Sequence, residues 1–483
     1  MVPNQRPSSR SRKLQPVKTP PAALKKRAKH GKLRWLWFIF GLAGIALVSA
    51  TAGGLLAVSL TSTPLMQRKL SPSESSVFSK GDRISTSGNL QLPELTRPVN
   101  ILILGVKVLT TDLAEPPAGM ANLKYHALVN SFDGLTDTML LLRFSPQTKK
   151  LSVLSIPRDT RALIPGYGVK KINEANVDGG PALAAKTTSD LLGGIGIDRY
   201  VTINVQGVQA LIDALGGVKV YVPKDMKYRD ESQHLYINLK AGQRHLNGDQ
   251  TLQLLRFRHD EYGDIGRIQR QQMVMRSLME QTLNPATIAR LPKILSVIQS
   301  YVDTNLSVEE LVALVGFASQ SSRSNVQMLT VPGTFSEPGE YDASYWLPSA
   351  DRITTLMAQH FDVGAVVPAD NSSGALRVAI QDSTRQANAV QTLVSKLGTA
   401  GYGNVVNAQP YTEPLAVTRI IAQQGNAESA EAVRRVLGFG EVRVESTGEL
   451  DSDVTIQLGQ DWLRKHARSQ QSANPAKPSS IAY

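Results

Sequence analysis

The sequence predicts a layered α/β protein: a large domain with a central mixed sheet flanked by helices, a small α/β domain behind it, and one N-terminal transmembrane helix. Three observations predict this fold class. Short apolar runs alternate with helical stripes over residues 99–333, and a second alternation of the same kind covers residues 375–460. A run of 26 uncharged residues precedes both.

The N-terminal part combines a basic arm with this uncharged run. Residues 1–34 hold eleven Lys and Arg residues and no acid, so the +13 charge of the 483-residue chain falls to +2 without them. Residues 35–60 are long enough to cross a bilayer as a helix, and their tryptophans favour its interface. The basic flank then predicts a cytoplasmic tail at 1–34 and an extracytoplasmic body, on a single-pass anchor in the plasma (inner) membrane. A cleaved signal peptide and a buried helix are the alternatives.

Composition excludes several classes of protein. The chain has no cysteine, which rules out disulfide scaffolds, thiolate metal sites, iron–sulfur clusters and cysteine nucleophiles. Because the basic arm already has a topological use, we expect no nucleic-acid partner. P-loop, HExxH, GxSxG and dinucleotide-binding contexts are absent from the sequence, and its histidines have no ligand-like spacing.

The elements of the large domain follow a linker rich in Ser, Pro and Thr at residues 61–98. Continuous apolar runs bounded by Gly or Pro predict buried strands, and apolar residues at helical spacing predict helices. Strands are expected at 100–105, 137–144, 151–157 and 325–333, helices at 182–194 and across 288–320, and a strand, a helix closed by glycines and a further strand within 201–223.

The C-terminal part reads as a second unit. Residues 334–374 are rich in Gly, Ser, Pro and aromatic residues and are expected to be a loop-like linker. Residues 375–460 continue as a βαββαβ alternation, whose first helix has apolar residues at 389, 390, 393, 394 and 397. The polar residues 461–483 predict a disordered tail.

The segment LLRFRHDEYGDIGRIQRQQMVM carries the clearest chemical signal. Arg256 and Arg258 would share one face of an expected strand, and neighbouring like charges favour an anionic partner. Asp264 is expected to cap the helix that follows, on which Arg267 and Gln271 lie one turn apart. In the alternative reading, these arginines form surface salt bridges with acids of the same segment.

A second cluster follows another expected strand. In SIPRDTRALIPG, the residues Arg158, Asp159 and Arg161 come after the strand ends, where ligands of α/β sheets usually bind. Lys171 follows in KKIN, and Asp137 precedes a further apolar strand. Cations from separate strand ends, together with a few carboxylates, suit a pyrophosphate held with a divalent metal ion.

These stretches together resemble the LytR-CpsA-Psr family. In chain order they are NILILG, GLTDTMLLLRF, LSVLSIPRDTR, KIN, DRYVTINVQGVQALIDALGGVKVYVP and HLNGDQTLQLLRFRHDEYGDIGRIQRQQ, within residues 99–285. Residues 375–460 resemble the LytR C-terminal domain that often follows. The resemblance implies a membrane-anchored phosphotransferase that moves a glycopolymer from a polyprenyl-pyrophosphate carrier to peptidoglycan through a phosphodiester. Some members of the family also show pyrophosphatase activity.

By motif, the resemblance also implies roles for single residues. Arg158, Lys171, Arg256, Arg258 and Arg267 would grip the pyrophosphate, with Gln271 and Arg161 as further contacts, Asp137 as a ligand of Mg²⁺, and Asp159 and Asp264 as residues that orient the arginines or activate the acceptor hydroxyl.

The sequence departs from the family pattern at two positions. The family usually has a carboxylate just after the first strand, in the pattern LGxD, whereas this chain has LGVK ending at Lys107. Either Asp112 or another acid replaces that ligand, or Lys107 itself neutralises phosphate charge, or metal binding is weakened. The arginine that often precedes the TDT motif is Leu135 here.

Two other functional classes stay open at this point. One is a non-catalytic glycan-binding or scaffolding protein of the envelope, whose arginines bind an anionic polymer. The other is a regulator of the transcriptional-attenuator type, which the basic arm suggests and the outward-facing body opposes.

Overall fold

The structure is a computed structural model that describes residues 69–78, 83–86, 93–112, 117, 120, 123–257, 263–282, 290–365, 374–386 and 388–465. Within these ranges no helix is both long and apolar enough to cross a bilayer. The expected basic arm and span at residues 1–60 lie outside the described residues, as do Arg258 and most of the expected tail.

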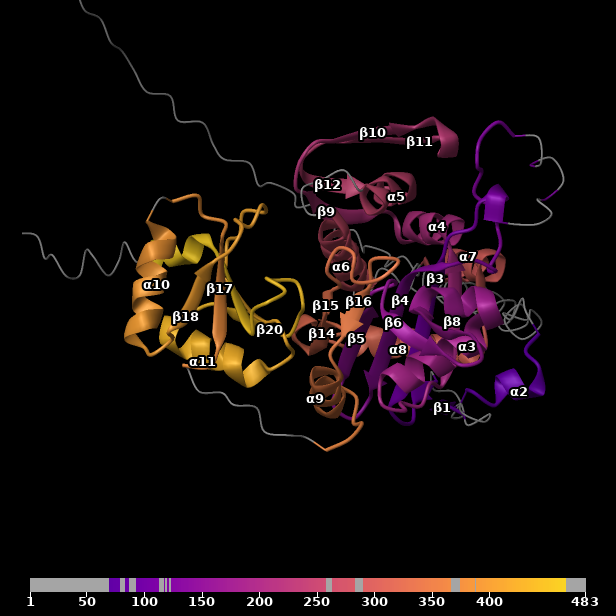
Figure 1. Ribbon diagram of the computed structural model, residues 1–483, viewed down its shortest axis with the longest axis horizontal. Coiled ribbons are helices and arrows are strands. Elements are labelled where there is room, and N and C mark those ends of the chain that lie inside the picture. Colours follow the sequence, from indigo (N-terminus) through magenta and orange to yellow (C-terminus); the bar gives the residue numbers. More distant parts are fainter. Residues whose placement is uncertain are drawn as a thin grey trace, which may run out of the picture. The chain divides into compact units, whose positions relative to one another are not determined.

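A six-stranded mixed sheet forms the centre of the large domain (Figure 1). Its middle strands pair antiparallel, whereas β3 with β8 and β5 with β14 are parallel pairs. The strand order is β13 (Val302–Thr304), β8 (Arg199–Asn204), β3 (Val99–Val106), β4 (Thr136–Ser145), β5 (Lys150–Ile156) and β14 (Val326–Thr330). The predicted strands and the mixed character of the sheet are thus confirmed.

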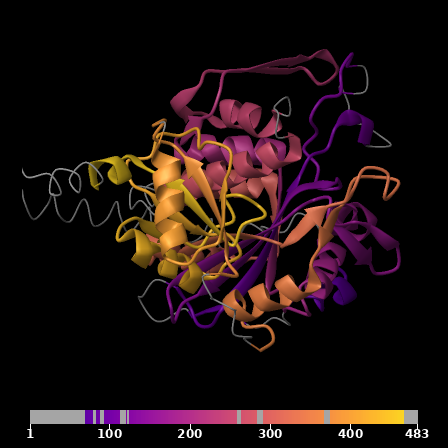
Figure 2. The same ribbon diagram turned by 60° about the vertical axis from the view of Figure 1, so that its left-hand side comes forward.

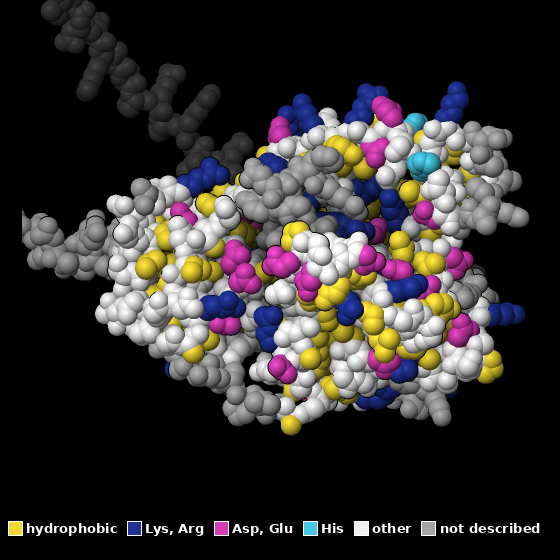
Figure 3. Space-filling view, viewed as in Figure 1, with side chains coloured by type: hydrophobic (Ala, Val, Ile, Leu, Met, Phe, Trp, Pro, Cys, Tyr) yellow, Lys and Arg dark blue, Asp and Glu magenta, His cyan; other side chains and the backbone are white. Residues whose placement is uncertain are grey.

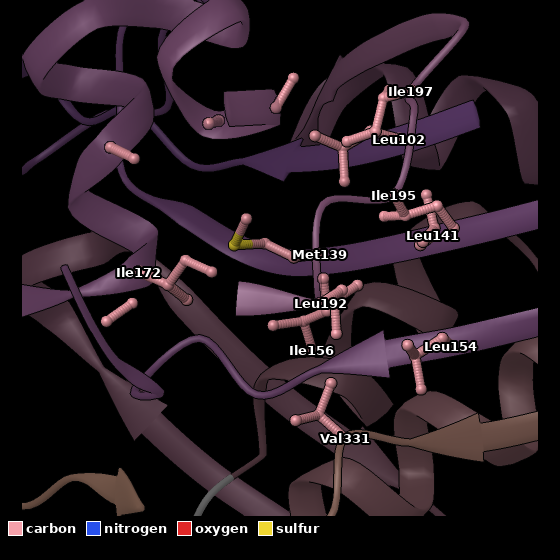
Figure 4. Packing of buried hydrophobic residues seen from close by; sticks show 14 of the residues in the cluster. Leu102, Met139, Leu141, Leu154, Ile156, Ile172, Leu192, Ile195, Ile197 and Val331 are labelled. Carbon is pink, nitrogen blue, oxygen red and sulfur yellow. The ribbon is translucent and has the colours of Figure 1, made fainter. Parts of the chain in front are cut away.

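Helices cover both faces of this sheet because its strands are apolar on both sides. Leu102 and Leu104 of β3 pack on one core, together with α3 (Ala175–Leu191) and α9 (Ala350–His360). Figure 4 shows this core, with Met139 and Leu141 of β4 beside Leu154 and Ile156 of β5. The alternate residues, such as Ile101, pack on the opposite core with α6 (Gly263–Thr282) and α8 (Val308–Gln320). A period of two along each strand therefore sorts the side chains into two buried layers.

A third core lies beside the sheet and has its own small strands. Its elements are α4 (Val205–Leu215), α5 (Gly248–Arg256), the pair β9 (Val218–Val222) with β12 (Gly242–Leu246), and the hairpin β10 (Met226–Asp230) with β11 (Leu235–Leu239). The helix α4 ends at Gly216 in the left-handed conformation, as the predicted glycine stop requires. In Figures 1 and 2 this satellite layer lies on the opposite side of the domain from α9.

The expected strand around Arg256 is wrong, because this residue is the last of the helix α5. Asn247 caps the helix and forms a capping box with Gln250, and Leu252 and Leu254 are buried. The helix α6 also begins two residues earlier than expected, at Gly263, so Asp264 lies in its first turn instead of preceding it.

Residues 334–361 are not the loop that the composition suggested. They contain β15 (Gly333–Phe335), β16 (Trp346–Pro348) and α9. Ile353, Leu356 and Met357 of α9 are buried in the main core at helical spacing. Similarly, Phe78 and Ile84 of the expected N-terminal linker are buried, so parts of that stretch belong to the packed domain.

The remaining elements of the large domain are short or lie at its periphery. They are α2 (Pro72–Ser75), β1 (Ser85–Thr86), β2 (Glu94–Leu95), the pair β6 (Arg161–Ile164) with β7 (Gly168–Lys171), and α7 (Leu291–Tyr301).

The C-terminal unit is a five-stranded mixed sheet with two helices. The strand order is β18 (Asn404–Asn407), β17 (Arg377–Asp382), β21 (Val454–Leu458), β19 (Arg419–Ala422) and β20 (Glu441–Arg443), with helices α10 (Ala389–Thr399) and α11 (Ala427–Leu437). The apolar stripe predicted for the first helix packs in this core at Ala389, Leu393 and Leu397. The chain order is βαββαββ.

Candidate active site

The candidate site lies at one edge of the central sheet, where β3, β5 and β8 end and β4 begins. At this edge the pairing of β3 with β4 is interrupted by a bulge. Gly105 pairs with Thr138 and Val106 pairs with Thr136, so Asp137 has no direct partner across the ladder. A bulge of this kind bends the strand and redirects a side chain, often beside a functional site. Here it places Asp137 in the lining of the cavity described below.

Gly105 is the residue that lets the two strands approach at the bulge. A Cβ atom at this position would lie 3.0 Å from the Cβ of Thr138, which is closer than side chains normally approach. Because Gly105 has no side chain, β3 and β4 can keep their regular pairing as far as Gly105 and Thr138, next to the bulge at Asp137.

A chain of ion pairs links Asp137 to the end of β5. The Nη1 of Arg158 donates to Oδ1 of Asp137 at 2.5 Å, and its Nε donates to Oδ2 of Asp159 at 3.3 Å. The Nζ of Lys171, at the end of β7, donates to the other oxygen of Asp159 at 2.8 Å. Asp159 therefore fixes the position of two cations, and Arg158 connects both carboxylates.

A cavity of about 260 Å³ opens at this edge. Its lining joins the central sheet to the satellite layer: Gly105, Val106, Lys107, Asp137, Thr138, Ile203, Val205, Val208, Tyr228, Asp230, Gln233, Leu235, Leu252, Leu255, Arg256, Arg267 and Gln271. A smaller cavity of about 20 Å³ shares Asp137, Thr138, Arg267 and Gln271 with it and reaches Arg158 and Asp159. Figure 3 shows Lys and Arg side chains gathered in a recess below the level of the β10–β11 hairpin.

Gln233 organises the cations on the satellite side of the cavity. Its Oε1 accepts from Nζ of Lys107 at 2.9 Å and from Nη2 of Arg256 at 2.9 Å. Its amide nitrogen faces Asp230 at 3.4 Å, which sets the orientation of the amide. The hydroxyl of Ser232 is the main cause that lowers the pKa of Asp230, and backbone N–H groups and the charge of Arg256 add to it against desolvation. Asp230 therefore stays ionised and holds the turn that carries Gln233.

One side of the cavity is apolar. Val205 and Val208 from α4, Leu252 and Leu255 from α5, and Leu235 from β11 line this side. An apolar slot beside clustered cations is suited to an amphiphile with an anionic head and a hydrocarbon chain.

Comparison with known proteins identifies the chain. The model of the LytR_cpsA_psr family matches residues 66–361, more than half of the chain. This protein belongs to the LytR_cpsA_psr family. A second model, described as the LytR cell envelope-related transcriptional attenuator, matches residues 375–462. The resemblance drawn from the sequence motifs is thus confirmed for both parts.

Relatives of this family member include proteins with different names. Regulatory protein MsrR of Staphylococcus aureus (strain COL) is 38% identical over 200 residues, which are 41% of this chain and 59% of MsrR. Polyisoprenyl-teichoic acid–peptidoglycan teichoic acid transferase TagV of Bacillus subtilis (strain 168) is 32% identical over 239 residues, 47% of this chain and 60% of TagV. The crystal structure of B. subtilis TagV aligns with 56% of this chain and 99% of its own at 27% identity, with a TM-score of 0.45. The chain thus spans about three fifths of these curated relatives.

In this LytR_cpsA_psr protein, most of the residues predicted from the sequence come together. Asp137, Arg256, Arg267 and Gln271 line the main cavity. Arg158 and Asp159 line the smaller cavity, and Lys171 is bonded to Asp159.

One predicted residue lies outside both cavities, and the side chains of two others are not among those described. Arg161 stacks on the ring of Tyr341, with its guanidinium carbon 4.9 Å from the ring centroid, and lines neither cavity. Arg258 lies outside the described residues, and of Asp264 only the backbone position in α6 is described. The helix α4 contributes Val205 and Val208 to the lining of the main cavity.

The contribution of the β10–β11 hairpin was not predicted from the sequence. Tyr228, Asp230 and Gln233 line the cavity, but they lie in a polar stretch without a recognisable motif. The only local signal is Asp230 followed by Glu-Ser, a pattern typical of a side-chain-capped turn.

The described donor set fits Mg²⁺ poorly. Among the described residues, no three His, Asp or Glu side chains converge on a point that could hold a metal ion. The carboxylate of Asp137 already accepts from Arg158, and Lys107 lines the same cavity. The expected role of Asp137 as a magnesium ligand stays a prediction.

Proposed function

We propose that this chain is a membrane-anchored phosphotransferase that moves a glycopolymer from a polyprenyl-pyrophosphate carrier to peptidoglycan, through a phosphodiester, during assembly of the cell envelope. The observation that carries the proposal is the cavity itself. Arg256, Arg267 and Asp137 line it, and Arg158 donates to the carboxylate of Asp137. An apolar slot adjoins these charged groups. These are the two surfaces that a lipid pyrophosphate requires.

In the proposed reaction, an acceptor hydroxyl attacks the phosphorus atom that bears the glycan. The phosphoanhydride bond breaks, a new phosphodiester forms, and polyprenyl phosphate leaves with the electrons of the broken bond. Charge builds up on the phosphoryl oxygens and on the leaving phosphate, and fixed cations stabilise it. Arg158, Arg256 and Arg267 would supply that stabilisation, with Gln271 as a neutral polar contact. The proton of the hydroxyl would pass to a carboxylate at the cavity, where Asp137, Asp159 and Asp230 are the described ones.

Asp159 has a second role in this proposal. Because it accepts from both Arg158 and Lys171, it would hold these cations at the end of β5 toward the phosphate. The same charges would also stabilise hydrolysis, in which water replaces the hydroxyl. A pyrophosphatase side activity is therefore part of the proposal.

The name of TagV, a teichoic acid transferase acting with polyisoprenyl carriers and peptidoglycan, supports the choice of reaction class. Residues 35–60 support the membrane anchor through their composition. A reporter fused after residue 483 tests this topology. We expect it to be active outside the cytoplasm, and activity confined to the cytoplasm would overturn the anchor.

The reaction is tested with the full chain purified in detergent. It is incubated with a short polyprenyl-pyrophosphate oligosaccharide and peptidoglycan, and both released polyprenyl phosphate and peptidoglycan-bound sugar are measured. We expect both products, with a strong loss in Arg158→Ala and Arg256→Ala. Binding without turnover, unchanged in these two variants, would instead identify a glycan-binding scaffold.

A further inference from the structure

The main cavity and the smaller cavity meet at the charged edge of the sheet. They share Asp137, Thr138, Arg267 and Gln271 and differ in the rest of their lining. The main cavity continues to apolar side chains of α4 and α5, whereas the smaller one continues to residues of β15 and β16. A lipid pyrophosphate that carries a glycan has a different group at each end. With its hydrocarbon chain in the apolar slot, its glycan end would therefore lie on the side of β15 and β16.

The β15–β16 hairpin is fixed to the end of β5 through Trp346. The backbone N–H of Trp346 donates to the carbonyl oxygen of Asp159 at 2.9 Å, and its indole Nε1 donates to that of Val331 at 3.1 Å. The ring of Phe335 meets the buried indole edge to face, with 5.0 Å between the ring centroids. A bridge between Thr160 and Trp346 places β16 beside β6 (Figure 1). These contacts hold the base of the hairpin against the ion pairs of Asp159.

Two tyrosines of the connecting loop, residues 336–345, lie against cations of the neighbouring β6–β7 hairpin. The guanidinium carbon of Arg161 is 4.9 Å from the ring centroid of Tyr341, and Nζ of Lys171 is 5.7 Å from that of Tyr345. Arg161 and Lys171 are directly opposite each other in the β6–β7 pair, so their side chains share one face. The two rings are partly exposed, and their centroids are 5.4 Å apart. Both rings are thus held in place at the surface.

The loop offers the chemical groups that recognise a carbohydrate. A pyranose ring has apolar C–H groups on its faces and hydroxyl groups at its rim, and tyrosine likewise combines an apolar ring with a hydroxyl group. A side chain that is already held in place loses little conformational freedom on binding. The carboxylates of Glu337, Glu340 and Asp342 are exposed on the same loop and can accept hydrogen bonds from sugar hydroxyls.

We propose that the loop 336–345 is a sugar-binding surface, on which Tyr341 and Tyr345 contact pyranose rings of a glycan. The inference rests on the proposed function and deepens it, because it assigns the hydrocarbon chain to α4 and α5 and the sugars to the β15–β16 side. Arg161 and Lys171 act as positioning residues for the two rings. The sugars belong either to the donor or to the acceptor, whose hydroxyl must reach the same phosphate. No bond forms or breaks at this surface.

The test measures binding to the full chain in detergent by isothermal titration calorimetry with three probes. The first is geranyl methylenebisphosphonate, a pyrophosphate analogue that cannot be cleaved and carries no sugar. The second is the same lipid analogue with an N-acetylglucosamine disaccharide on its outer phosphonate. The third is a soluble peptidoglycan tetrasaccharide, which carries no phosphate.

Two double variants and one control are compared with the wild type. Replacing both Tyr341 and Tyr345 by leucine removes both rings, whereas replacing both by phenylalanine keeps them. Tyr167→Leu is the matched control, because Tyr167 is an exposed tyrosine of the β6–β7 hairpin that also lies near a lysine and lines neither cavity. Thermal unfolding of each variant checks that it is folded.

We expect the double leucine variant to bind a sugar-bearing probe at least about tenfold more weakly than the wild type, and the sugar-free probe within about threefold of it. The double phenylalanine variant should stay within about fivefold of the wild type for every probe, because it keeps the ring contacts. The control should bind all three probes like the wild type. A loss with the lipid-linked disaccharide identifies the donor as the source of the sugars, and a loss with the tetrasaccharide identifies the acceptor.

Two results would overturn the inference and leave the proposed function intact. One is unchanged binding of both sugar-bearing probes by the folded double leucine variant. The other is an equal loss for the sugar-free probe, which would mean that the tyrosines support the phosphate site instead of contacting sugars. If the wild type binds neither lipid analogue, the proposed function itself fails, so the wild-type titrations distinguish the two kinds of failure.

Discussion

Replacing Arg158 by methionine separates two roles that the structure gives to this side chain. Its guanidinium neutralises Asp137 at 2.5 Å, and it lines the small cavity where a phosphate would lie. The side chains of Arg158 and Asp137 are 21% and 35% exposed, so their pairing should contribute only about 1 kcal/mol to stability. Loss of one donor to a developing oxyanion, however, typically lowers kcat by about 100- to 1000-fold.

The double variant Arg158→Met with Asp137→Asn decides between these roles. If Arg158 acts only by neutralising Asp137, removing both charges should restore turnover to within about tenfold of that of the Asp137→Asn single variant. We expect no such restoration, because the phosphate loses its contact in either case.

The assay is release of polyprenyl phosphate from a labelled lipid-linked oligosaccharide under single-turnover conditions. Arg244→Met serves as the control, since Arg244 is exposed on β12 and donates to the backbone oxygens of Lys240 and Ala241. A loss of less than threefold in folded Arg158→Met would refute the assignment of Arg158 to the phosphate site.

Three further predictions concern the bulge and the fold. Gly105→Ala brings a Cβ to 3.0 Å from Thr138, so we expect kcat to fall about tenfold through displacement of the bulge, with a stability loss of about 1 kcal/mol; unchanged kcat would contradict this. Burial lowers the pKa of His360 from 6.5 to about 4, so the folded state excludes a proton that the unfolded chain binds. The free energy of unfolding should be highest above pH 6.5 and fall by up to about 3 kcal/mol as the pH is lowered toward 4. Urea titrations should show that this free energy depends less on pH in His360→Gln. Leu356→Ala removes a side chain that is 3% exposed and should lower the free energy of unfolding by about 2–5 kcal/mol, whereas a loose linker helix would lose almost nothing.

The central strands were predictable because they are buried on both faces. Runs such as NILILG and TMLLLRF have no polar face, and a continuous apolar run of that length fits few other structures. The glycine stop at Gly216 was equally clear, since the helix ends there in a conformation that favours glycine.

The prediction of a strand at Arg256 was wrong because a few residues with alternating side chains are too short a stretch to distinguish a strand from a helix. Leu252 and Leu254 are both buried in the helix, and the capping box at Asn247 was the stronger local signal. The helix α9 was overlooked for a related reason. Its flanks are rich in Gly, Pro and Ser, and they obscured the apolar spacing of Ile353, Leu356 and Met357.

The site was predictable where strand ends carry charges and where α6 carries Arg267 and Gln271 one turn apart. Asp137 and Arg158 follow this rule, and the sheet brings them together as expected from its topology. The contribution of Gln233 depends on how a distant hairpin folds back over the sheet edge, and no local pattern encodes that contact. The bulge at Asp137 depends on the pairing of two strands, which a single segment does not specify.

The two halves of the cavity belong to separately packed cores. Asp137 and Arg158 are fixed by the central sheet, whereas Leu252 and Leu255 are carried by a layer with its own buried cluster. Substitutions inside that layer can therefore widen or narrow the apolar slot while the charged edge keeps its geometry. Under the proposed function, preference for the length of the lipid could then diverge among related chains without any change at the charged edge.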